Sequence, residues 1–175
     1  MFQLSKTLLD RPVMSLRTGR PVATTVAAII NPNNLKIEGF YCQDSIDKKT
    51  QLILINQDIR DIIPQGIVID DHDVLSEPDE LVRLKQVLDI GFELTGKPVL
   101  TNNKKRIGKV SDYAIESSTL YIQKIYVSQS ILKSLAGGSL GVDRSQIVEI
   151  TNKHIIIQDP LQPKRSLARA ALPAN

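Results

Sequence analysis

The chain has 175 residues, of which 42% are hydrophobic and 23% charged, as expected for a soluble globular protein with a folded core. No apolar run approaches the roughly 18 residues that a membrane-spanning helix needs, and Met1–Asp10 lacks the hydrophobic stretch of a secretory signal. The one cysteine, Cys42, excludes an internal disulfide, so we expect a cytoplasmic protein.

The net charge of +3 is unevenly distributed. Residues 160–175 carry Lys164, Arg165 and Arg169 and no acid, so residues 1–159 are formally neutral. A neutral body lacks the positive charge on which non-specific phosphate binding rests. The last segment is rich in Ala and Pro and has little to bury, so we expect a disordered basic tail over residues 160–175.

A β-hairpin is predicted near the start of the chain. Val22–Ile30 is dominated by Val, Ile, Thr and Ala, Asn31–Asn34 has the composition of a turn, and Leu35–Cys42 forms the return strand. The apolar positions of the return strand change phase at Gly39, which predicts a β-bulge. Bulges bend strands, and a small sheet must bend to close into a barrel.

The clearest predicted helix covers residues 76–93. Ser76 is placed as the N-cap, with acids and Pro78 in the first turn, and Gly91 is placed as the stop. The apolar residues fall on one stripe: Leu81, Leu84, Val87 and Leu88. We expect this amphipathic helix to pack on a neighbouring barrel or between two of them.

An internal repeat determines the predicted architecture. A shift of 85 positions places Val22–Cys42 over Ile107–Val127 without a gap, with agreement at nearly every apolar position. The identical pairs are Ile30 and Ile115, Leu35 and Leu120, Ile37 and Ile122, and Tyr41 and Tyr126. The same phase change recurs at Lys124, so the second copy is expected to carry the same bulge.

The repeat continues towards the end of each copy. Asp58 falls on Asp143 and Ile62 on Ile147, and a three-residue insertion then restores the match at residues 67–69 and 155–157. Each copy is predicted to end in a second hairpin, over residues 58–70 and 146–158. A short helix is predicted at Ser128–Leu135, as an insertion in the second copy.

The second copy resembles the PRC-barrel family, named for the photosynthetic reaction centre H subunit and related in fold to the C-terminal domain of the RimM ribosome maturation factors. The residues that carry the resemblance are Leu94–Val99, Arg106–Asp112, Leu120–Ile122, Asp143–Ile147 and Ile155–Ile157. The first copy is more divergent, with Pro21–Thr24 in place of Ile107–Val110. The resemblance implies small antiparallel barrels that serve as docking modules, and it implies no shared catalytic residues.

The predicted fold is therefore mainly β, with two small antiparallel PRC-type β-barrels in tandem joined by a short amphipathic helix. Residues 1–75 are assigned to the first barrel, 76–93 to the linker helix and 94–159 to the second barrel. Each barrel is expected to close on its own aliphatic interior.

Sequence patterns give no catalytic, cofactor or metal site. Asp70–Asp73 holds carboxylates and an imidazole without the spacing of a calcium loop, and is interpreted as a solvated turn. Ala136–Gly141 is glycine-rich but lacks the Gly-Lys-Ser/Thr of a phosphate-binding loop. Cys42 is placed in the core, and His72 and His154 fall in polar turns with no identifiable nucleophile. We expect no enzyme.

Our first hypothesis is a non-enzymatic cytoplasmic interaction or adaptor protein whose tandem barrels dock a protein partner. Tyr41 and Tyr126 are repeat-equivalent, are predicted to point outward, and are the candidate partner-binding residues, together with the exposed flank of the linker helix. The alternative is an RNA- or ribosome-associated factor of the ribosome-maturation type. It requires a set of basic residues to converge on one face: Lys104, Lys105, Arg106, Lys109 and Lys124.

Overall fold

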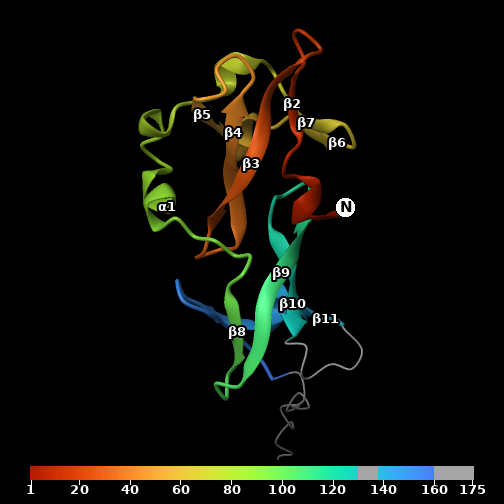
Figure 1. Cartoon of the computed structure of the whole chain (residues 1–175), viewed down its shortest axis with the longest axis vertical. Helices are drawn as coiled ribbons and strands as arrows, with labels where there is room; N and C mark the ends of the chain where they lie inside the picture. Colours follow the sequence, from red (N-terminus) through yellow and green to blue (C-terminus); the bar gives the residue numbers. More distant parts are fainter. Residues whose placement is uncertain (130–137, 160–175) are drawn as a thin grey trace, which may run out of the picture.

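The computed structural model describes residues 1–129 and 138–159, which form a mainly β fold with a six-stranded and a seven-stranded sheet (Figure 1). The six-stranded sheet has the order β5-β4-β3-β2-β7-β6. Its strands are β2 (Pro12–Ser15), β3 (Pro21–Asn31), β4 (Lys36–Asp44), β5 (Gln51–Ile55), β6 (Asp61–Ile63) and β7 (Gly66–Ile69). We call it the first sheet.

The second sheet repeats this order as β11-β10-β9-β8-β13-β12, with β1 added against β9. Its strands are β1 (Phe2–Leu4), β8 (Pro98–Thr101), β9 (Arg106–Glu116), β10 (Ile122–Gln129), β11 (Ser139–Asp143), β12 (Ile147–Ile150) and β13 (Ile155–Ile157). In both sheets the hairpins are antiparallel and one pair is parallel, β2 with β7 and β8 with β13. Within the described residues the strand pairing of each sheet runs from one edge strand to the other without closing into a barrel.

The predicted repeat and its bulges are confirmed. In the β3–β4 pair Glu38 is the extra residue beside Gly39, and in the β9–β10 pair Gln123 is the extra residue beside Lys124. Further unpaired residues recur at equivalent places along the described strands: Val26 in β3 with Ser111 in β9, and Val22 in β3 with Ile107 in β9. All these pairs are 85 positions apart, so the two sheets bend at the same places.

The later part of the repeat has a different register from the predicted one. Gly39 pairs with Ile55 and Lys124 pairs with Asp143, so Asp143 is equivalent to Ile55 and not to Asp58. By the same shift of 88 positions, Ile150 and not Ile147 is equivalent to Ile62. The extra residues therefore lie in the β10–β11 connection. The sequence alone was ambiguous here because isoleucine occurs at both registers.

The connection between β10 and β11 includes residues 130–137, which lie outside the described residues. The helix predicted at Ser128–Leu135 falls there, except for Ser128 and Gln129, which belong to β10. The predicted tail, 160–175, also lies outside the described residues.

The predicted linker helix is broken into two short pieces. A 3₁₀ turn, η4 (Pro78–Glu80), is capped by Glu77 and not by Ser76, because Ser76 forms a β-bridge with Ile53 at the edge of β5. Leu81 then leaves helical geometry, and α1 (Lys85–Ile90) follows. Gly91 ends α1 in the left-handed conformation with φ of 55°, as predicted. The remaining short 3₁₀ turns are η1 (Ser5–Thr7), η2 (Asn56–Asp58), η3 (His72–Val74) and η5 (Arg144–Gln146).

The two sheets meet tip to tip through their long hairpins (Figure 1). Lys36 and Tyr121 form an antiparallel bridge. The Ile37 amide donates to the Leu120 carbonyl and the Ile122 amide donates to the Leu35 carbonyl, both at 2.9 Å. These residues are equivalent in the repeat, so the contact is reciprocal, as in an isologous two-fold interface. The chain therefore has an internal pseudo-two-fold axis between Lys36 and Tyr121.

The segment before each copy packs on the other copy's long hairpin. At the start of the chain, β1 pairs with β9, and the Ser5 hydroxyl donates to the buried carboxylate of Asp112. Before the second copy, α1 lies beside β3 of the first sheet. Buried hydrophobic side chains from both sheets form one connected cluster, from Val13 and Phe40 in the first to Ile125 and Ile155 in the second. The two interiors are thus continuous and not separate as predicted.

Across residues 1–129 and 138–159 no helix combines the length and the apolar character that crossing a bilayer would need.

Candidate functional site

The two predicted partner-binding residues point away from the core. Tyr41 lies between the fully buried Phe40 and Cys42, and Tyr126 lies between the fully buried Ile125 and Val127. Since side chains alternate along a strand, both tyrosines lie on the opposite face, where they are half-buried. Tyr41 belongs to β4 of the first sheet and Tyr126 to β10 of the second.

A groove runs along the linker between η4, α1 and the outer face of the first sheet. We call it the linker groove; its volume is about 660 Å³. Its apolar lining consists of Ile55, Leu81, Val82, Leu84 and Val87, and its polar lining consists of Asn31, Glu38, Asn56, Gln57, Glu80, Arg83 and Gln86. Three residues of the predicted apolar stripe therefore line the groove, and they are half-buried. Val82 projects from the wall with 79% of its surface exposed.

The linker is held at both ends of the groove. The Ser76 bridge to Ile53 fixes its start, with amide-to-carbonyl distances of 2.8 and 3.1 Å. The Glu77 side chain caps η4, and the Glu80 carboxylate accepts from the Glu77 amide at 3.0 Å. Gly91 then turns the chain towards buried Phe92. These restraints keep the groove wall in place without filling the groove.

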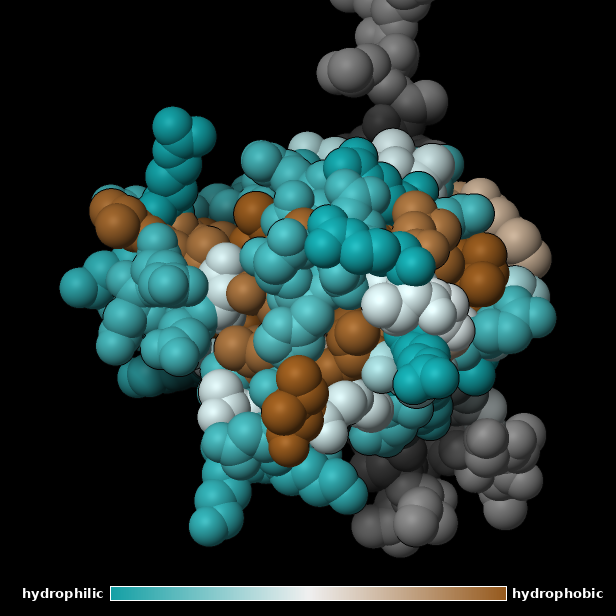
Figure 2. All heavy atoms as spheres, turned by 90° about the horizontal axis from the view of Figure 1, so that it is seen from above, coloured by the Kyte–Doolittle hydropathy of each residue, from teal (hydrophilic) through white to brown (hydrophobic). Residues whose placement is uncertain are grey.

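The surface around this end of the molecule is mixed. Seen along the long axis from the end that carries the first sheet, hydrophobic residues form separate groups among hydrophilic ones (Figure 2). One group lies on the left, the side where Figure 1 places the linker. An apolar groove with a polar surround is the usual composition of a recognition site.

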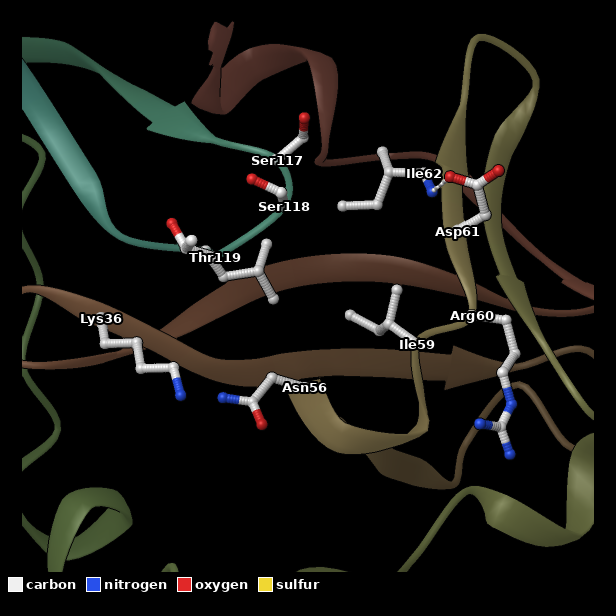
Figure 3. Close-up of a pocket in the computed structure, with 10 residues that line it drawn as sticks. Lys36, Asn56, Ile59, Arg60, Asp61, Ile62, Ser117, Ser118 and Thr119 are labelled. Carbon is white, nitrogen blue, oxygen red and sulfur yellow. Dashed lines mark hydrogen bonds between the residues drawn. The ribbon is translucent and has the colours of Figure 1, made fainter. Parts of the chain in front are cut away.

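Two smaller pockets flank the pseudo-two-fold axis and are equivalent in the repeat. The first, the Lys36 pocket, has a volume of about 380 Å³ and lies between the β9–β10 turn and the η2–β6 segment (Figure 3). Its lining is Lys36, Asn56, Ile59, Arg60, Asp61, Ile62, Ser117, Ser118, Thr119 and Leu120. The second, the Arg144 pocket, has a volume of about 340 Å³. Its lining is Pro32, Asn33, Asn34, Leu35, Arg144, Ile147, Val148, Glu149 and Ile150.

The two pockets differ in chemistry. Arg144 reaches across the axis, where its Nη2 donates to the Asn34 carbonyl at 2.6 Å and its guanidinium lies 4.9 Å from the centre of the Tyr121 ring. The equivalent residue in the first sheet is Asn56, which donates to the Ile37 carbonyl and to Glu38, both at 3.1 Å. Asn56 therefore binds within its own half, and no side chain crosses the Lys36 pocket as Arg144 crosses its counterpart.

Protein groups satisfy the acidic cluster at Asp70–Asp73. Asp70 pairs with Arg60 through two hydrogen bonds, and Asp71 accepts from Ser15 at 2.8 Å and pairs with Arg17 at 3.1 Å. Hydrogen bonds from Ser15 and from the His72 amide hold the pKa of Asp71 below its ordinary value. Over the described ranges no group of three or more His, Cys, Asp or Glu side chains is arranged to hold a metal ion.

His72, from the same cluster, binds Asp44 at the end of β4. Its Nε2 lies 3.0 Å from Asp44 Oδ1. Burial acts to raise the pKa of Asp44, but hydrogen bonds from the Ile46 amide, His72 and the Asp47 amide outweigh it, so the pKa lies below its ordinary value of 3.8. The charged form of Asp44 is thus stabilised by the fold.

This gives an expected pH dependence. A pKa below the unfolded-state value means that the stabilisation is complete above about pH 5 and is lost as the pH falls through the folded-state pKa, below about 4. We expect Asp44→Asn to flatten the acid limb of a plot of unfolding midpoint against pH. The exposed Asp89→Asn serves as the control and should leave that limb unchanged. Identical acid limbs for Asp44→Asn and the wild type would contradict the assignment.

Cys42 is a core residue, as predicted. Its side chain is fully buried, and burial raises the pKa of its thiol to about 12. A thiol with this pKa is not a thiolate at neutral pH. Of the glycine-rich stretch, Ala136 and Gly137 lie outside the described residues, and Ser139–Gly141 belong to β11.

The basic residues required by the RNA hypothesis do not all converge. Lys104 and Lys105 lie in the β8–β9 turn, which Arg106 and Lys109 follow on β9. Lys124 lies farther along the sheet, opposite Ala114, and its ammonium pairs with Asp143 at 3.2 Å.

A scan against models of known protein families and a search of curated proteins both give no match to this chain. The fold and the grooves define it as a mainly β protein made of two equivalent sheets around a pseudo-two-fold axis.

Proposed function

We propose that this protein is a tandem PRC-barrel-type protein that docks another protein in the cell and has no enzymatic activity of its own. In this proposal each bent sheet is a PRC-type barrel left open between its edge strands, and the linker is the connecting helix. The linker groove is the docking surface. The observation that carries the proposal is a groove with five aliphatic side chains in its lining, whose wall is fixed at both ends while Val82 remains 79% exposed.

The lining defines the class of partner. Five aliphatic side chains along the groove favour a short segment with Leu, Ile or Val side chains, since burying each stabilises a complex by roughly 1.5–3 kcal/mol. The volume is within the range of about 300–1,000 Å³ that is usual for binding pockets. Glu38, Glu80 and Arg83, which also line the groove, provide polar contacts for the segment. A combination of apolar and polar contacts is typical of protein interfaces.

The test is site-specific photo-crosslinking in cells, with p-benzoylphenylalanine at position 82. We expect one dominant protein adduct, and we expect Val82→Glu to weaken binding of that purified protein about tenfold or more, because a charge would enter an apolar contact. Ile46→Glu is the matched control, since Ile46 is 83% exposed in the β4–β5 turn, away from the groove. Equal loss of binding in both variants would refute the groove as the docking surface. RNA as the dominant adduct would favour the alternative function.

A further inference from the structure

We propose that the Lys36 pocket is a second binding site, which takes a carboxylate group carried on an aliphatic chain. The inference goes beyond the proposed function, because it stands on a different pocket and can hold even if the linker groove binds nothing. It rests on the comparison of two pockets that the repeat makes equivalent.

The comparison shows what is missing from the Lys36 pocket. In the Arg144 pocket a guanidinium closes the gap between the two halves by binding the Asn34 carbonyl and stacking on Tyr121. At the equivalent place, Asn56 is shorter and is held by the Ile37 carbonyl and by Glu38. The gap between the β9–β10 turn and η2 therefore stays open, and Figure 3 shows it between Ser118 and Ile59.

The charge of the pocket selects its ligand. Lys36 takes the position that Tyr121 has in the counterpart, so a cation like the Arg144 guanidinium would be repelled here. The Lys36 ammonium lies 5.8 Å from the centre of the Tyr121 ring and joins no ion pair with the described residues. The Lys36 ammonium lines the pocket and has no acidic partner among the described residues. It therefore favours a ligand that carries an anionic group.

The other charged residues of the lining do not compete. Arg60 turns out of the pocket towards Asp70, to which it donates from Nε at 2.9 Å (Figure 3). Asp61 lies at the end of the pocket remote from Lys36, where its carboxylate accepts from the Ile62 amide at 2.8 Å. Of the three charged residues in the lining, only Lys36 has a side chain that joins no ion pair or hydrogen bond with the described residues.

The remaining lining fits a carboxylate with an aliphatic body. Ser117, Ser118 and Thr119 lie on the turn, across the pocket from Ile59 and Ile62 (Figure 3). The Ser117 hydroxyl donates to the Met1 carbonyl at 3.0 Å, and the Thr119 hydroxyl donates to the Glu116 carboxylate at 3.1 Å. A carboxylate bound to Lys36 can place its aliphatic part against the isoleucines. Lysine acts as a point charge, which suits a carboxylate held by one ion pair.

The experiment is an NMR titration of ¹⁵N-labelled full-length protein with N-acetyl-leucine and with N-acetyl-leucinamide. The two probes differ in charge and share the aliphatic side chain. We expect saturable shifts at the amides of Lys36 and Ser117–Leu120, with the carboxylate binding about tenfold more tightly, since hydrogen bonds to charged groups are the stronger ones. N-acetyl-aspartate-α-amide is the third probe. If it binds more tightly than N-acetyl-leucine, the ligand is a side-chain carboxylate. If it binds more weakly, the ligand is the carboxylate of a chain terminus. Equal binding of acid and amide in the wild type would overturn the proposal.

Two matched variants locate the site. Lys36→Met keeps the aliphatic stem and removes the charge, so we expect it to abolish the preference for the acid. Lys49→Met makes the same change at an exposed residue in the β4–β5 turn and should retain the preference. Shifts that persist in Lys36→Met would refute the site. Val82→Glu should bind N-acetyl-leucine as the wild type does. The test of the linker groove and the test of the Lys36 pocket therefore have independent outcomes.

Discussion

Replacement of Phe40 by alanine is expected to lower the free energy of unfolding by about 3–5 kcal/mol, the usual cost of removing a fully buried aromatic ring. Phe40 has no exposed surface and is among the largest fully buried side chains of the connected core. It follows the bulge at Gly39, where β4 bends around that core. Because domains are stable by only about 5–15 kcal/mol, the variant should lose a large share of its total stability.

Urea denaturation followed by far-ultraviolet circular dichroism measures this loss. The control is Tyr41→Ala, which removes a ring of similar size from the next residue on the outer face of β4. Tyr41 is half-buried, so its loss should cost clearly less. Equal losses for the two variants would contradict the assignment of Phe40 to the inner face.

Replacement of Gly108 by alanine is expected to destabilise the protein by about 2–3 kcal/mol, at the upper end of the usual cost of overpacking. An added Cβ would clash with the Ser128 carbonyl oxygen and lie 2.9 Å from its carbonyl carbon. Both are backbone atoms of β10, so relief requires β9 and β10 to move apart. A flexible side chain could have moved aside at much lower cost.

Gly138→Ala is the matched control for this prediction, because an added Cβ there meets nothing within 4 Å. Thermal unfolding of both variants gives the comparison. We expect a marked decrease in the unfolding midpoint for Gly108→Ala and little change for Gly138→Ala. An unchanged midpoint for Gly108→Ala would show that β9 and β10 do not approach each other this closely.

The repeat, the hairpins and the repeated bulges could be predicted from the sequence because they depend on local patterns. Alternation of apolar residues fixes which face of a strand is buried, and the phase change at Gly39 and Lys124 marks the bulge directly. The pairing of β1 with β9 could not be predicted in this way. It joins residues more than one hundred positions apart, and no local pattern in Phe2–Leu4 specifies its partner strand.

The candidate site was only partly predictable for a related reason. The linker was identified from its apolar stripe, but we expected that stripe to pack on a barrel, whereas Leu81, Leu84 and Val87 line the groove. The difference between the two junction pockets was missed because the predicted register matched Asp58 with Asp143. In the observed register Asn56 is equivalent to Arg144. A comparison of the copies in that register would have shown the loss of the crossing guanidinium.

The reciprocal bonds between the hairpin tips also have an evolutionary consequence. A solitary copy of this unit could pair with itself through the same two bonds, Ile37 to Leu120 and Ile122 to Leu35, as a homodimer. In a homodimer any substitution changes both sides at once. Fusion into one polypeptide frees each side to change alone, so two different residues, Lys36 and Tyr121, can face each other across the axis.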